Sequence, residues 1–157
     1  MTESAAIVQY LVTRYGPTPL AVGTDEPDYG AYLNWLHFGE ATLTFPQTLV
    51  LRYSKLEPEE RRNPQVATDY SKWFFGRLRA VEAAVSKSET LCGGRFTVAD
   101  ISVGYALLLA ERIGLAKDFT PAVAAFWQRL REREGFCRAV KAEILAGEQQ
   151  KVAASSW

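Results

Sequence analysis

Glu3 and Ser4 are the first residues in this sequence whose types and spacing could do chemistry. They stand directly before an apolar stretch, at a point where a helix is expected to begin. The hydroxyl and backbone N–H of a serine at a helix N-terminus can hold a carboxylate, and a neighbouring glutamate can hold an ammonium group. The spacing alone favours a simpler role, in which Ser4 is the N-cap and Glu3 is an acidic neighbour.

Thr97 and Asp100 form the second pair of this kind. Their spacing is that of a capping box, in which the threonine at the N-cap and the acidic residue at N3 accept hydrogen bonds from each other's backbone N–H groups. Phe96 and Ile101 flank the pair at the positions of a hydrophobic staple. A catalytic acid at Asp100 is the alternative, but a lone carboxylate at N3 needs no chemistry to explain it. We therefore predict a structural cap.

Composition argues against several other functions. The 18 Lys and Arg residues balance the 18 Asp and Glu residues, so no net charge favours nucleic acid or anionic lipid as a partner. Apolar runs are too short to cross a bilayer and the N-terminus lacks a signal-peptide pattern, which predicts a cytoplasmic protein. The single histidine, His37, and the distant cysteines Cys92 and Cys137 match no metal or redox spacing, so we predict no metal site.

Apolar residues recur at spacings of three and four, which predicts an all-α fold. The expected helices cover residues 4–15, 29–53 with a kink at Pro46, 64–87, 98–113, 121–134 and 136–146. Gly135 is expected to end the fifth of them. The helix 98–113 is apolar on every side, so we expect it to be buried at the centre of a bundle.

Two motifs carry a family resemblance. The segment Phe96-Thr97-Val98-Ala99-Asp100-Ile101, followed by an apolar helix, resembles the capping box and staple of the glutathione transferase C-terminal domain. The segment Glu3-Ser4-Ala5-Ala6-Ile7 resembles the start of the last helix in that family's thioredoxin-like N-terminal domain. The resemblance implies that residues 1–16 are this last helix of a truncated thioredoxin-like domain. It further implies a linker at 17–28, a helical C-terminal domain at 29–150 and a tail at 151–157.

The same resemblance implies a function. Glutathione transferases conjugate the glutathione thiolate to small apolar electrophiles, so glutathione would be the co-substrate, with Glu3 and Ser4 at its γ-glutamyl end. The family's thiol-activating residue lies upstream of these motifs, so no catalytic residue is named here, and we expect the chain alone to be inactive. The electrophile pocket would be lined by Phe38, Thr42, Phe45, Tyr105 and Arg112.

Other roles remain open for these residues and for the chain. Aromatic side chains at helical spacing suit core or dimer packing as well as a pocket, and the resemblance implies a homodimer. A non-catalytic interaction or dimerisation module of the same fold is the alternative function. A stand-alone helical carrier of apolar ligands is a third possibility. The sequence does not identify the electrophile or the transferase class.

Overall fold

The computed structural model describes residues 1–151, and these contain helices and loops without a strand. This confirms the predicted all-α class. The elements are α1 (Ser4–Arg14), α2 (Tyr29–His37), the π-helix η1 (Phe38–Thr44), α3 (Phe45–Leu51), the π-helix η2 (Arg52–Leu56), the 3₁₀-helix η3 (Glu59–Arg61), α4 (Pro64–Val85), α5 (Val98–Arg112), the 3₁₀-helix η4 (Ala116–Asp118), α6 (Pro121–Arg131) and α7 (Glu134–Gln149).

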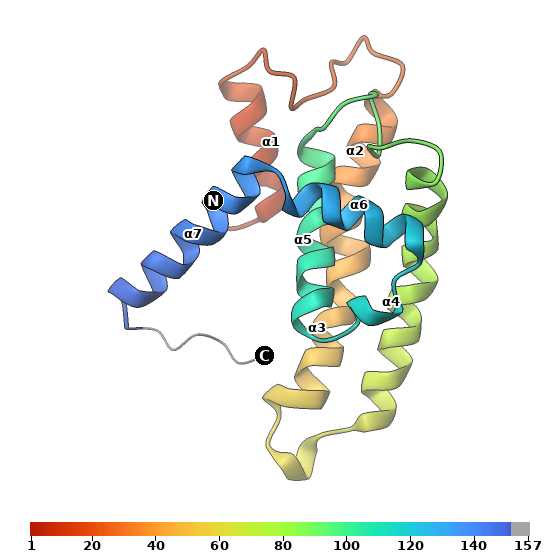
Figure 1. The fold of residues 1–157 in the computed structure, drawn as a ribbon, viewed down its shortest axis with the longest axis vertical. Coiled ribbons are helices and arrows are strands. Elements are labelled where there is room, and N and C mark those ends of the chain that lie inside the picture. The colour runs from red at the N-terminus through yellow and green to blue at the C-terminus, as the bar shows by residue number, and fades with distance from the viewer. Residues whose placement is uncertain (152–157) are drawn as a thin grey trace.

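Helix α5 runs through the middle of the bundle, beside the α2–α3 rod and behind α6 (Figure 1). Its buried residues, among them Val103 and Leu107, join one large core with α4 and α6, and Val98 joins a smaller core with α2. The prediction that α5 is covered on every side is wrong. Ile101 and Tyr105 are 41% and 53% exposed, because no described element covers that face of the helix.

The segment 29–56 is a continuous helical rod, although not the kinked α-helix that we predicted. Directly before Pro46 the chain changes from α to π geometry over η1. A proline lacks the N–H that an α-helix needs, and its ring crowds the carbonyl four residues earlier, here that of Thr42. The wider π turns give that carbonyl room. A buried hydrogen bond from the Thr44 Oγ1 hydroxyl to the Gly39 carbonyl, 2.9 Å long, spans the same segment.

Close packing and hydrogen bonds hold this rod against α5, among them a bond from the Ser102 hydroxyl to the Leu36 carbonyl at 2.7 Å. Gly39 lies so close to Ser102 that a Cβ atom at position 39 would stand 2.4 Å from the Ser102 hydroxyl oxygen. The buried amide of Gln47 donates to the Leu43 carbonyl at 2.9 Å and to the Ala106 carbonyl at 3.0 Å. The rod therefore has one fixed position on the helix that forms the centre of the fold.

Several expected boundaries shift. Glu3 is the N-cap of α1, so Ser4 lies one position inside the helix rather than at its cap. Gly135 does not end the preceding helix, because α6 ends at Arg131 and Gly135 lies in the first turn of α7. The predicted tail at 151–157 lies outside the described residues except for Lys151. None of the helices in residues 1–151 is long and apolar enough to cross a membrane.

Candidate functional site

The N-terminus of α1 is open to solvent. Glu3 and Ser4 are both exposed, and the Glu3 side chain makes no capping hydrogen bond. Ser4 Oγ instead donates to Glu40 Oε2 of η1, at 3.2 Å. The backbone N–H groups of the first turn, which have no partner within the helix, therefore lie beside one hydroxyl and two carboxylates. Such a set can hold a ligand carboxylate on the helix end and a ligand ammonium group on Glu3 or Glu40.

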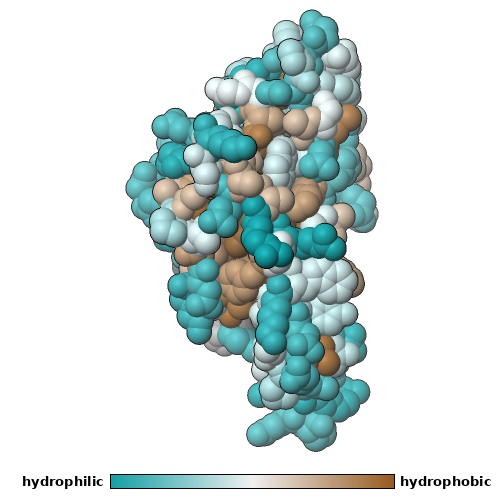
Figure 2. Space-filling view, turned by 90° about the vertical axis from the view of Figure 1, so that its right-hand side faces the viewer, coloured by the Kyte–Doolittle hydropathy of each residue, from teal (hydrophilic) through white to brown (hydrophobic). Residues whose placement is uncertain are grey.

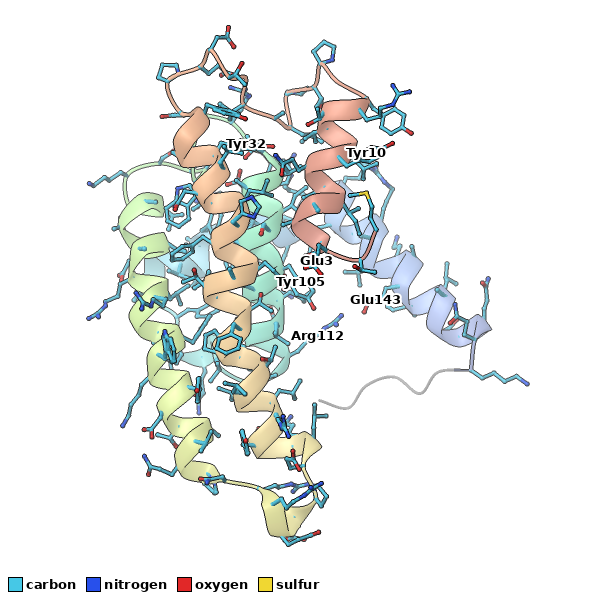
Figure 3. The ribbon with its side chains drawn as sticks, turned by 180° about the vertical axis from the view of Figure 1, so that it is seen from behind. Glu3, Tyr10, Tyr32, Tyr105, Arg112 and Glu143 are labelled. Carbon is cyan, nitrogen blue, oxygen red and sulfur yellow. The ribbon has the colours of Figure 1, made fainter. Side chains whose placement is uncertain are left out.

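Tyr105 and Arg112 lie two turns apart on the exposed face of α5. Figure 3 shows both residues on the same side of the molecule as Glu3, in the space between α1, α5 and α7. Arg112 Nη2 donates to both carboxylate oxygens of Glu143 in α7, each at 3.1 Å. The structure therefore brings two predicted pocket residues to the side where the predicted glutathione-binding pair lies.

The other three predicted pocket residues lie elsewhere. Phe38 and Thr42 line a shallow hollow of about 330 Å³ whose walls belong to α2 and η1. Phe45 is 51% exposed, and its ring makes a T-shaped contact with the Trp73 ring on α4, with centroids 6.4 Å apart. The structure does not gather all five residues into one pocket.

A wider groove of about 530 Å³ separates α4 from the η4–α6 segment. Phe75, Leu78 and Val123 form its apolar wall. Figure 2 faces this side of the molecule and shows hydrophobic surface framed by hydrophilic side chains. None of the predicted site residues lines this groove, so its size alone does not make it the candidate site.

A capping box with Thr97 at the N-cap and Asp100 at N3 begins α5. The Thr97 N–H donates to Asp100 Oδ2 at 2.8 Å, and the Ala99 N–H donates to Thr97 Oγ1 at 3.3 Å. Asp100 also accepts from the Leu91 N–H at 3.0 Å, which ties the preceding loop to the cap. Burial raises the pKa of Asp100, although its hydrogen bonds favour the carboxylate. Its position inside the core suits a structural cap and not a group that reaches a substrate.

The cysteines offer little for catalysis. Cys92 is buried against the Thr97 hydroxyl, and burial raises the pKa of its thiol. A thiol with a raised pKa is a poor nucleophile, because the thiolate is the reactive form. Cys137 is exposed in α7.

Sequence reasoning missed the two carboxylates that meet predicted site residues. Glu40 lies 36 positions from Ser4, and Glu143 lies 31 positions from Arg112. Each pairing depends on how separate helices meet, so no local pattern in the sequence marks either residue.

Comparison with known proteins identifies the family. The family model for the glutathione S-transferase C-terminal domain matches residues 49–134. Glutathione S-transferase GstA of Escherichia coli O157:H7 is 30% identical over 145 residues, which are 92% of this chain and 69% of that protein. Glutathione S-transferase 3 of Schizosaccharomyces pombe is 26% identical over 149 residues, 87% of this chain and 60% of that protein. The chain therefore belongs to the glutathione S-transferase family.

Solved structures agree on the fold. Ure2p5 from Phanerochaete chrysosporium, cocrystallised with 1-(S-glutathionyl)-2,4-dinitrobenzene, has a TM-score of 0.82 at 24% identity, over 95% of this chain and 71% of that one. The glutathione transferase URE2P6 from the same organism, in complex with oxidized glutathione, has a TM-score of 0.80 at 26% identity, over 90% of this chain and 66% of that one. The helices thus have the arrangement of a glutathione transferase C-terminal domain.

Proposed function

We propose that this chain is the helical part of a dimeric glutathione S-transferase that conjugates glutathione to small apolar electrophiles. The observation that carries the proposal is the open N-terminus of α1, where Glu3 lies on the same side of the molecule as Tyr105 and Arg112 and is followed by Ser4. Glu3 would hold the ammonium and Ser4 the carboxylate of the γ-glutamyl group. That placement would direct the thiol toward α5, where Tyr105 offers an aromatic surface to an apolar electrophile.

The proposed reaction needs a thiolate, because a glutathione thiol must lose its proton before its sulfur can attack an electrophilic carbon. We assign that deprotonation to a thioredoxin-like unit, of which α1 would be the last helix. The surface of α1 supports this assignment, since the large apolar side chains of Tyr10 and Leu11 are each 47% exposed. The relatives support it too, because the chain spans 69% and 60% of the two named above.

The Phe45–Tyr70–Trp73 cluster is the proposed dimer surface. The Tyr70 and Trp73 rings stack with centroids 5.4 Å apart, and Phe45 meets Trp73 edge-on. Exposed aromatic clusters of this kind are typical of protein interfaces. We therefore expect Trp73→Ala to shift the chain toward monomer in light scattering, while Tyr15→Ala, at an exposed tyrosine on another face, leaves its mass unchanged. A wild-type monomer at high concentration would contradict the assignment.

Glutathione titration tests the proposed site. We expect backbone amide signals of residues 3–6 to shift when glutathione is added, because those N–H groups would meet its carboxylate. A hydrogen bond to a charged group contributes about 1.5–3 kcal/mol, and each of Glu3→Gln and Ser4→Ala would weaken one such bond to a charged end of glutathione. Each variant should therefore bind about tenfold or more weakly. Ser54→Ala, at an exposed serine in η2, is the matched control.

Two outcomes would contradict the proposal. Glutathione that shifts no signal near α1 would favour the alternative, a non-catalytic interaction module of the same fold. Conjugation of an aryl halide by this chain alone would refute the assignment of thiol activation to a separate unit.

A further inference from the structure

Arg95 joins the loop before α5 to the linker between α1 and α2. Its Nη1 and Nη2 atoms donate to the two carboxylate oxygens of Glu26 at 2.8 and 2.7 Å. Nη2 also donates to the Ala21 carbonyl at 2.7 Å, and Nε donates to the Pro19 carbonyl at 3.1 Å. A fifth bond joins Nη1 to the Gly93 carbonyl at 3.2 Å. All five N–H groups of the guanidinium are therefore used.

The surrounding backbone strengthens this junction. The Val98 N–H donates to the Leu20 carbonyl at 2.9 Å, and the Gly93 N–H donates to Asp28 Oδ2 at 2.8 Å. The hydrogen bond from Arg95 is the main reason why the pKa of Glu26 falls to about 2, so the carboxylate stays charged at neutral pH. Linker residues on both sides of Ala21 are thus tied to the start of the central helix.

Helix α1 has few other anchors. It contains no buried residue. Its half-buried side chains Ala5, Val8 and Val12 pack against the smaller core, and Ser4 makes an exposed hydrogen bond to Glu40. The linker leaves α1 at Arg14 and reaches its first tie to Arg95 soon afterwards, at Pro19. A short tether of this kind limits how far the helix can tilt or slide on α5.

We propose that Arg95 is a positioning residue that fixes α1, and with it Glu3 and Ser4, on the helical bundle. The five-bond geometry selects arginine for this task, because a lysine ammonium cannot reach carbonyls and a bidentate carboxylate in one plane. The role of Arg95 in holding α1 stands on the contacts alone. Its consequence for glutathione rests on the proposed function.

Hydrogen exchange on the intact chain tests the positioning role. In Arg95→Lys, amides of residues 7–14 should exchange about tenfold faster, as expected when local stability falls by the equivalent of one net hydrogen bond. Amides of α4 and α6 should keep their wild-type rates. Arg52→Lys is the matched control, since Arg52 also pairs with a glutamate, Glu57 at 2.7 Å, but at the far end of the bundle. Arg52→Lys should leave the exchange rates of the α1 amides unchanged.

A second measurement separates positioning from general stability. Under the proposed function, glutathione should shift the Ser4 amide less in Arg95→Lys than in wild type, while the thermal midpoint changes little. Glu26→Gln, which breaks the same pair from its other side, should have the same local effect and replaces Arg95→Lys if that variant fails to fold. Unchanged exchange in α1, or equal acceleration in every helix, would overturn the inference. If glutathione shifts no signal in the wild-type chain while Arg95→Lys still accelerates exchange in α1, the proposed function would be refuted and the positioning role would stand.

Discussion

Replacing Asp100 with alanine should reveal how much the buried cap of α5 contributes to stability. The substitution removes the acceptor for the N–H groups of Thr97 and Leu91 and for the Thr97 hydroxyl. Asp100 is fully buried, so water cannot replace the lost partner. An unsatisfied buried donor costs about 1–3 kcal/mol, and two backbone donors are left here.

A second effect opposes the cost of the unsatisfied donors and reduces the expected destabilisation. Burial raises the pKa of Asp100, which means that the folded state disfavours the charged carboxylate, and alanine removes that cost. We expect a net loss of about 2–4 kcal/mol in the free energy of unfolding. At about 2–4 °C per kcal/mol for a chain of this size, the melting midpoint should fall by about 5–15 °C.

Urea and thermal unfolding, followed by far-ultraviolet circular dichroism, measure this loss. Asp118→Ala provides the control, because Asp118 is an exposed residue in the 3₁₀-helix after α5. It should change stability by less than about 0.5 kcal/mol. If Asp100→Ala cost no more than the control, the reasoning that ties the cap to stability would be refuted.

Three further predictions follow from the same structure. Gly39→Ala should destabilise the chain by about 1–3 kcal/mol in urea unfolding, because its Cβ would overlap Ser102, whereas Gly30→Ala in α2, with open space around it, should be neutral or stabilising. Glu26→Gln should abolish a pH-dependent stabilisation: the folded pKa of Glu26 is about 2 and its usual value is 4.5, so this contribution is present above about pH 4.5 and lost as pH falls through about 2. The protection of α1 amides against hydrogen exchange should therefore become equal in wild type and variant near pH 2, and a difference that persists at pH 2 would count against the Arg95 pairing. Arg112→Ala should free α7 from its bond to Glu143, seen as faster proteolysis within α7 and no change in the bundle.

Local signals in the sequence predicted most of the fold. The capping box and the Asn63 cap of α4, whose side-chain oxygen accepts from the Val66 N–H, lie within three residues of their partners. The π geometry of η1 was not predictable in this way, because apolar spacing does not reveal a change of helical register. That change also explains why Phe38 and Phe45, seven positions apart, do not share one pocket: π turns rotate the second residue away from the face that an α-helix would give it.

The candidate site was only partly predictable for a related reason. Glu3 and Ser4 could be named as candidates from the sequence, since their motif is local. Their contact with Glu40 could not be recognised, because it depends on how α1 packs beside η1. The pairing of Arg95 with Glu26, 69 positions away, likewise depends on how the linker packs against the start of α5. Such pairings arise from packing, which one sequence does not display.

Helix α7 is held to the bundle by few contacts, which should affect the order in which the chain unfolds. Figure 1 shows this helix projecting from the bundle, and it buries none of its residues. Phe136 reaches back to Trp127 of α6, edge-on with ring centroids 5.5 Å apart. Helix α7 should therefore detach as a separate cooperative unit while the core is still folded. Because the indole of Trp127 touches the helix that leaves, its fluorescence should change before the helical circular dichroism of the bundle is lost.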